Sequence, residues 1–215
     1  MSAEAIEIAL DVGTTAARRY GARGELTLVL AHGAGAGQAH PFMVRWASAL
    51  ADRGVEVVTF DFPYMNGKRR APDRMPVLVS AYAAVAAWAR ARGPGRLAIG
   101  GKSMGGRVAS MLAAEHADAA DALVFLGYPL HPPGEPDKLR AAHLPKIAAP
   151  MLFVQGERDP FGGPDELRPI LATLPRATLL PVPGGDHSLA VPKKLRAQAE
   201  VDAALQDAIV AFLRR

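Results

Sequence analysis

The chain has 215 residues, of which 50% are hydrophobic and 21% are charged, and its formal net charge is +4. This length fits one domain, residues 1–215, with a sizeable core. The sequence contains no run of about 18 apolar residues, which excludes a transmembrane helix, and its start does not have the pattern of a secretion signal. Since it has no cysteine, disulfides, a thiolate nucleophile and a cysteine-based zinc site are also excluded. We expect a cytoplasmic protein without membrane association.

The basic residues do not indicate a nucleic-acid partner. Lys68, Arg69 and Arg70 form the one dense cluster, and no aromatic stacking motif accompanies it. We interpret the cluster as a solvated loop, with steering of an anionic substrate as the alternative.

Short apolar runs alternate with segments of helical periodicity, a pattern typical of parallel strands joined by crossover helices. Strands are predicted at 4–9, 25–31, 55–61, 96–100, 122–127, 151–155 and 177–182. Helices are predicted at 42–52, 76–92, 104–116 and from about 196 onward, and the proline-rich stretch 129–136 is predicted to be a loop. In such sheets ligands bind at the carboxyl ends of the strands, so the segments after each strand are expected to carry the chemistry.

The segment IGGKSMGG at residues 99–106 could belong to either of two unrelated sites. A P-loop has the pattern G-x-x-x-x-G-K-[ST], which would require glycine at position 96, where the chain has Arg96. Residues 97–99 also have the composition of a buried strand, whereas a P-loop needs a flexible loop there. The P-loop interpretation therefore fails in spacing and in local structure.

The same segment matches G-x-S-x-G between a predicted strand and a predicted helix, where a nucleophile elbow lies. Gly101 and Gly105 would let strand and helix approach closely while Ser103 occupies a strained turn. The turn would expose the Ser103 hydroxyl and leave the N–H of Met104 free to bind an oxyanion. A five-residue motif often occurs by chance, and the alternative is an ordinary glycine-rich turn, so the assignment needs catalytic partners.

A serine nucleophile needs a histidine base and an acid that orients it, and in this arrangement they follow in the order Ser, acid, His. Asp159 follows one predicted strand and His187 follows the next, so both lie at the same edge as Ser103. The competing carboxylates are Glu157, inside the turn, and Asp186, too close to the histidine to orient it from behind. Taken singly, the two residues would be a turn-capping aspartate and a loop histidine. Together they predict a Ser103–Asp159–His187 triad.

The segment LAHGAGAG at residues 30–37 predicts a second oxyanion donor. Its small residues let the backbone approach a reacting carbonyl, and we predict the N–H of Ala34 as the donor, with that of Gly35 as the alternative. A dinucleotide-binding G-x-G-x-x-G starting at Gly33 would need glycine at position 38, which is Gln38. A nucleotide-binding dehydrogenase is therefore the weaker interpretation.

Over nearly its whole length the chain resembles the α/β-hydrolase superfamily. The segments LAHGAGAG, FDFPYMNGKRRAPDR, GGKSMGGRVAS, GYPLHPPG and VQGERDPFG carry a narrower likeness. They are similar to those of a small group of predicted hydrolases, related to dienelactone hydrolase, that includes testis-expressed protein thirty and the hydrolase-like region of a regulatory subunit of the non-specific-lethal histone acetyltransferase complex. The resemblance implies an α/β-hydrolase fold with a mostly parallel sheet and helices on both faces. It also implies a serine hydrolase with the triad above, but it supplies no substrate.

Two further loops follow strands and are expected to border the site. They contain the candidate substrate contacts Tyr64, Arg69, Arg70, Tyr128 and His131, with structural loop packing as the alternative. Between residues 126 and 151 there is too little chain for a multi-helix lid. A minimal or absent lid favours an open site and a small, soluble substrate.

The sequence therefore predicts a serine hydrolase that cleaves an ester, thioester or related acyl bond through an acyl-enzyme, without a metal or organic cofactor. The expected partner is a small-molecule acyl substrate, and the sequence indicates no particular oligomeric state. A non-catalytic module of the same fold that binds a partner protein is the alternative. The complete triad argues against it.

Overall fold

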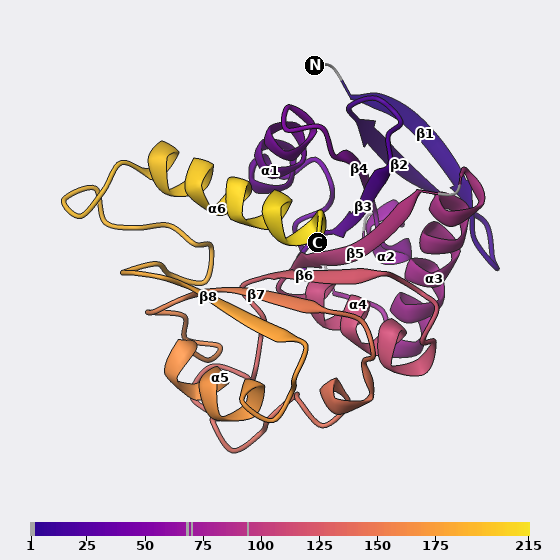
Figure 1. Ribbon diagram of the computed structural model, residues 1–215. Coiled ribbons are helices and arrows are strands. Elements are labelled where there is room, and N and C mark those ends of the chain that lie inside the picture. Colours follow the sequence, from indigo (N-terminus) through magenta and orange to yellow (C-terminus); the bar gives the residue numbers. More distant parts are fainter. Residues whose placement is uncertain (1–2, 68, 70, 94) are drawn as a thin grey trace.

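The chain folds around one central sheet in the computed structural model, which describes residues 3–67, 69, 71–93 and 95–215 (Figure 1). The eight strands lie in the order β1-β2-β4-β3-β5-β6-β7-β8. Their bounds are β1 (Glu4–Ala9), β2 (Thr14–Tyr20), β3 (Leu26–Ala31), β4 (Glu56–Phe60), β5 (Arg96–Lys102), β6 (Ala122–Leu126), β7 (Met151–Gly156) and β8 (Ala177–Val182). Strands β3 to β8 pair in parallel, whereas β2 pairs antiparallel with both β1 and β4.

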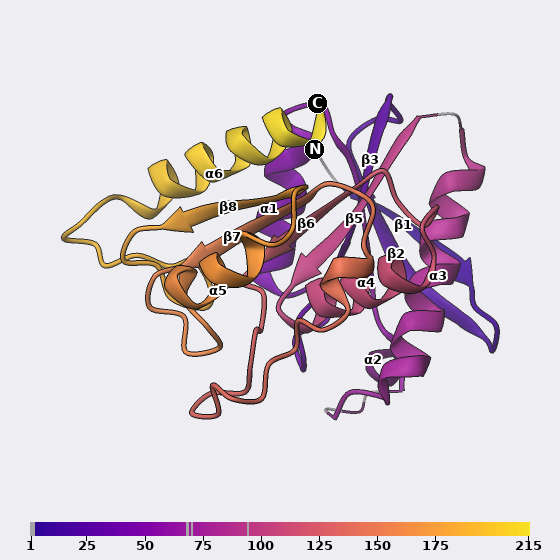
Figure 2. The same cartoon turned by 60° about the horizontal axis from the view of Figure 1, so that its bottom comes forward.

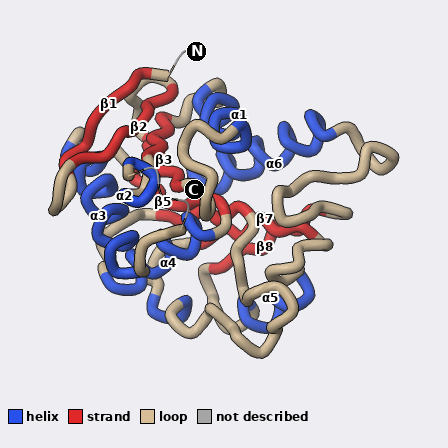
Figure 3. Tube along the Cα trace, turned by 180° about the vertical axis from the view of Figure 1, so that it is seen from behind, coloured by secondary structure: helices blue, strands red, loops and turns tan. Residues whose placement is uncertain are grey.

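Helices cover both faces of the sheet, as Figures 2 and 3 show. They are α1 (Pro41–Ala51), α2 (Pro63–Asn66), α3 (Met75–Ala91), α4 (Met104–Glu115), α5 (Pro164–Leu171) and α6 (Gln198–Leu213), with a short 3-10 helix, η1 (Leu144–Lys146). Helices α1 and α6 bury Trp46 and Leu205 against one face. Helices α3 and α4 bury Tyr82 and Val108 against the other, where Leu167 of α5 joins the same core. The predicted mostly parallel sheet with helices on both faces is confirmed.

The helices form where the sequence has apolar residues at helical spacing. In α1 the stripe of Phe42, Trp46 and Leu50 is buried. Pro41 occupies the first turn, where its missing N–H leaves no hydrogen bond unmade, and the ring of His40 accepts the N–H of Phe42 at 3.2 Å. Within the described residues, none of the helices combines the length and the apolar character that crossing a lipid bilayer requires.

The sequence prediction missed β2 and the short helices α2 and α5. Strand β2 alternates exposed residues with the buried Thr15 and Ala17, so its small and polar composition hides a strand that faces solvent on one side. Helix α5 begins at Pro164 and contains Pro169, which weakens its helical signal. The segment 129–136 contains no helix or strand, in agreement with the predicted loop.

The outer strands of the sheet differ in character from the central ones. Strand β8 contains Pro181, which is paired with Gln155 of β7, and most of its residues are half-buried. At the opposite edge β1 exposes Glu4 and Glu7. Strands β3 to β7 are largely buried, and the carboxyl ends of the parallel strands all reach one edge, where the candidate site lies.

Candidate active site

Ser103 lies in a strained turn between β5 and α4. Its φ of 50° and ψ of −115° are rarely adopted by residues other than glycine, and such strain costs on the order of 1–3 kcal/mol. The turn is held by its backbone: the Ser103 N–H donates to the carbonyl of Leu126, and its own carbonyl accepts the N–H of Arg107, both at 3.1 Å. The structure therefore has the backbone geometry of a nucleophile elbow at the predicted serine.

The glycines flanking Ser103 are required by close backbone approach. A Cβ at Gly101 would lie 2.5 Å from the carbonyl oxygen of Ala31, and a Cβ at Gly105 would collide with the same oxygen. Both glycines therefore let the first turn of α4 lie against the end of β3. This contact brings the loop after β3 beside the serine.

The structure brings Ser103, Asp159 and His187 together. In the sequence, Ser103 and His187 are 84 residues apart, and Asp159 and His187 are 28 residues apart. The Nε2 atom of His187 lies 2.9 Å from the Ser103 hydroxyl, and its Nδ1 atom lies 2.8 Å from Oδ2 of Asp159. With the Nδ1 proton donated to the carboxylate, Nε2 is left to accept the serine proton. The arrangement has the geometry of a charge-stabilised base beside a nucleophile.

Asp159 is held by groups that the sequence analysis did not identify. Its side chain is fully buried, its Oδ2 also accepts Nε2–H of Gln155 at 2.9 Å, and its Oδ1 accepts the N–H of Phe161 at 2.9 Å. Gln155 in turn accepts the N–H of Tyr128 at 2.8 Å. A glutamine at the end of an otherwise apolar strand was the sequence signal for this role. The Phe161 ring lies against the His187 ring, with centroids 4.3 Å apart.

The competing carboxylates have other partners. Glu157 accepts the N–H of Gly184 at 2.8 Å, and Asp186 accepts the N–H groups of Ser188 and Ala190 at 2.7 and 3.0 Å. Both therefore stabilise the loop that presents His187. Neither makes the hydrogen bond to its ring that Asp159 makes.

The loop after β3 provides backbone donors beside the serine. The N–H of Gly35 donates to the hydroxyl of Tyr64 at 3.0 Å, so this donor is already occupied. In the part of the chain that the structure describes, the N–H groups of Ala34 and Met104 have no intramolecular acceptor. Of the two predicted alternatives, the hydrogen bonding thus favours Ala34 as the partner of Met104 in an oxyanion hole.

His32 fixes the start of this loop. Its Nδ1–H donates to the carbonyl of Gly33 at 2.7 Å, and its Nε2 accepts the N–H of Phe62 at 3.1 Å. The ring is fully buried, and this burial lowers the pKa of His32 below its usual value, against the opposing effects of the Gly33 carbonyl and Asp61. A neutral ring is what this bonding requires, because a protonated Nε2 could not accept the Phe62 N–H.

A cleft of about 300 Å³ opens beside Ser103. Its walls are mostly apolar and include Ala34, Phe42, Met43 and Phe161, with His187 at one side. This volume is at the lower end of the range for small-molecule sites. The cleft therefore has room for a small ligand.

Lys102, directly before the serine, also lines the cleft and is 9% exposed. Its Nζ atom is buried and has no hydrogen-bond partner among the described residues. Burial lowers the pKa of Lys102 to about 8, and the carboxylates of Asp159 and Asp186 limit the decrease. From the sequence, this residue is a candidate lysine of a P-loop, which the spacing rejects, and otherwise the variable position of the G-x-S-x-G motif.

The predicted substrate contacts mostly have structural roles, which corrects that expectation. Tyr64 and Tyr128 are fully buried, and the Tyr128 hydroxyl donates to the Arg140 carbonyl at 2.8 Å. His131 is 4% exposed, and its two ring nitrogens lie 2.8 Å from the Pro132 carbonyl and 3.0 Å from Glu166. These side chains are thus not free to contact a ligand.

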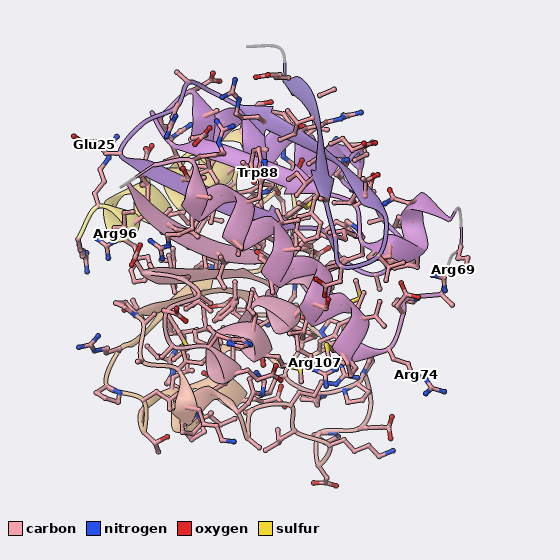
Figure 4. The ribbon with its side chains drawn as sticks, turned by 90° about the vertical axis from the view of Figure 1, so that its right-hand side faces the viewer. Glu25, Arg69, Arg74, Trp88, Arg96 and Arg107 are labelled. Atoms are coloured by element: carbon pink, nitrogen blue, oxygen red, sulfur yellow. The ribbon has the colours of Figure 1, made fainter. Side chains whose placement is uncertain are left out.

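The arginines of the loop after β4 lie at the surface. Arg69 is exposed and pairs with Asp73 at 2.6 Å, and in Figure 4 it lies at the right-hand margin of the view. Arg70 lies outside the described residues. Arg69 is not among the described residues that line the cleft, so the structure does not support the expectation that it faces the substrate.

Residues 24–214 match a protein family described as the alpha/beta hydrolase domain. A serine hydrolase without a lid from Xanthomonas campestris is 22% identical, with 100% of this chain and 97% of that chain covered and a TM-score of 0.75. An alpha-beta serine hydrolase homologue from Coxiella burnetii is 19% identical, with 99% and 98% covered and a TM-score of 0.78. Dienelactone hydrolase from Anabaena variabilis is 20% identical, with 96% and 95% covered and a TM-score of 0.75. At these identities the three structures show a shared fold.

Proposed function

Because the chain belongs to the α/β-hydrolase family, we propose that it is a serine hydrolase that cleaves an ester, thioester or related acyl bond with Ser103, His187 and Asp159. The observation that carries this proposal is the continuous set of hydrogen bonds from the Ser103 hydroxyl through His187 to the buried Asp159, at 2.9 and 2.8 Å. This set lies at the wall of the cleft, next to the N–H groups of Ala34 and Met104, which have no acceptor among the described residues. The narrower relationship to testis-expressed protein thirty stays a prediction.

The first half-reaction forms an acyl-enzyme. The Ser103 oxygen attacks the acyl carbon of the substrate while Nε2 of His187 takes the hydroxyl proton, and Asp159 stabilises the imidazolium that forms. The carbonyl oxygen becomes an oxyanion and accepts hydrogen bonds from the N–H groups of Ala34 and Met104. When the tetrahedral intermediate collapses, the bond to the leaving group breaks and the imidazolium returns its proton to the leaving alcohol or thiol.

The second half-reaction repeats these steps with water. His187 takes a proton from a water molecule, which attacks the acyl carbon, and the bond to the Ser103 oxygen breaks as the proton returns to it. The free acid leaves, and the chain regains its starting state without a metal or organic cofactor. The small cleft volume favours a small, soluble substrate over a long lipid, and we expect the protein to act in the cytoplasm.

Labelling with a fluorophosphonate probe tests the proposal. We expect the wild-type protein to be labelled at Ser103, the Ser103→Ala variant to remain unlabelled and the His187→Ala variant to react slowly. Ser188→Ala is a matched control, because Ser188 also lines the cleft but its hydroxyl makes no hydrogen bond to a histidine among the described residues, whereas Nε2 of His187 bonds Ser103. A folded wild-type protein that is not labelled would contradict the proposal and favour a non-catalytic module that binds a partner protein.

A further inference from the structure

Lys102 is a buried cation in the wall of the cleft. Its stem passes the loop that carries the oxyanion donor, since a Cβ at Gly33 would lie 3.6 Å from Cγ of Lys102. Its Nζ atom lies 5.9 Å from the centre of the Phe42 ring, another part of the cleft wall. A Cβ at Gly127 would lie 3.1 Å from Nζ and 3.4 Å from Nδ1 of His187, so the ammonium and the catalytic imidazole are at most 6.5 Å apart.

The nearest carboxylates do not pair with this ammonium. Among the described residues, Lys102 makes neither an ion pair within 4.0 Å nor a hydrogen bond through Nζ. Asp159 uses its oxygens for His187, Gln155 and Phe161, and Asp186 caps the backbone of Ser188 and Ala190. The three ammonium protons therefore have no acceptor in the part of the chain that the structure describes. A buried charge without a partner is costly, so an anion that reaches it is bound strongly.

Among the described residues that line the cleft, none carries a negative charge that would repel an anion. They include no aspartate, glutamate or arginine, and apart from Lys102 the groups that can be cationic are the histidines His40 and His187. With a pKa of about 8, the Lys102 side chain is mainly protonated near neutral pH. The four-carbon stem can turn the ammonium toward a ligand that enters beside Ser103.

We propose that Lys102 determines substrate specificity by binding a carboxylate of the substrate, so that the preferred substrates are acyl compounds that carry a second, anionic group. This inference rests on the proposed serine hydrolase function and names its substrate class. The position of Lys102 next to Ser103 places the anionic group in the same cleft as the scissile bond. An apolar residue at this position would leave the cleft without a charge that selects among esters.

Two pairs of esters test where the anion is bound. Mono-p-nitrophenyl adipate and p-nitrophenyl hexanoate have the same acyl length and differ in a terminal carboxylate. 4-Acetoxybenzoate and phenyl acetate differ in a carboxylate on the leaving group. For at least one pair, we expect the ratio of kcat/KM for the anionic to the neutral ester to fall about 10- to 100-fold in Lys102→Met, mainly through KM, because a hydrogen bond to a charged group is lost.

The control variant is Arg45→Met, because Arg45 stacks on the same Phe42 ring but is exposed and pairs with Asp202. This variant should keep the wild-type ratio. An unchanged ratio for both pairs in Lys102→Met would overturn the proposal. If both members of each pair also lost activity equally, the lysine would support the fold or the base instead.

A binding measurement separates this proposal from the proposed hydrolysis. We expect adipate to raise the Tm of the wild-type protein more than hexanoate does, and this difference to disappear in Lys102→Met but to persist in Ser103→Ala. This result requires no turnover, so it can hold even if fluorophosphonate labelling fails. Equal shifts by adipate in the wild-type and Lys102→Met proteins would overturn the assignment.

Discussion

The hydroxyl of Tyr82 supports the strand that presents the serine, and its removal should destabilise the protein. Tyr82 extends from α3 to β3 and β5, where its fully buried hydroxyl accepts the N–H of Gly100 at 2.9 Å and lies 2.8 and 2.6 Å from the carbonyls of Val29 and Gly100. Tyr82→Phe leaves the Gly100 N–H and at least one carbonyl without this partner. Since each unsatisfied buried group costs about 1–3 kcal/mol, we expect the free energy of unfolding to fall by about 2–4 kcal/mol.

Urea unfolding followed by far-UV circular dichroism measures this loss. For a chain of this length, about 2–4 kcal/mol corresponds to a decrease in Tm of roughly 5–15 °C. Tyr20→Phe is the matched control: its hydroxyl is also buried but has no hydrogen-bond partner among the described residues, so its removal should cost little or stabilise the fold. Equal losses for the two variants would refute the reasoning, because size and burial alone would then explain the effect.

Two further outcomes follow from the site, and a third follows from a buried histidine outside it. Asp159→Asn should lower kcat for a p-nitrophenyl ester about 10³- to 10⁴-fold with an unchanged circular dichroism spectrum, because it removes the negative charge that stabilises the imidazolium; a loss below tenfold would contradict its role. Tyr64→Phe frees the Gly35 N–H and loosens the oxyanion loop, so kcat should fall more than KM rises, whereas an effect on KM alone would indicate direct substrate contact. Burial lowers the pKa of His143 to about 4 in the folded protein, whereas its ordinary pKa is near 6.5, so between pH 6.5 and 4 the unfolded chain binds more protons than the folded protein does. The free energy of unfolding should therefore decrease as the pH falls through this range, while above pH 6.5 the histidine is neutral in both the folded and the unfolded protein. Urea titrations at each pH should show that His143→Gln flattens this decrease.

The layout of the candidate site could be predicted because it depends on strand order and on glycines. Ser103, Asp159 and His187 each follow a parallel strand, so their arrival at one edge follows from the alternation of strands and helices. Gly101 and Gly105 are informative because a side chain at either position would meet the backbone of β3. Local patterns of this kind survive in a single sequence.

The contacts that hold the site could not be predicted, since they join segments far apart in the chain. Tyr64 follows a strand in a motif-like loop, which suggested a ligand contact, but its ring is fully buried and its hydroxyl binds Gly35, 29 residues away. The role of Gln155 depends on the loop that contains Asp159 and on Tyr128. Whether Lys102 has an ion-pair partner depends on where the surrounding loops place their carboxylates, which no spacing rule gives.

Pro181 in β8 has a consequence for self-association. Proline lacks the N–H that a further strand would need, and β8 is the outer strand at that side of the sheet. At the other side, Glu7 of β1, which has no ion-pair partner among the described residues, would place a negative charge against an incoming copy of the strand, whereas Glu4 pairs with Arg19. Both edge strands thus disfavour the addition of a strand from another molecule, which protects the protein against aggregation through a continuous intermolecular sheet. The loops at the carboxyl ends of the parallel strands stay accessible to ligands.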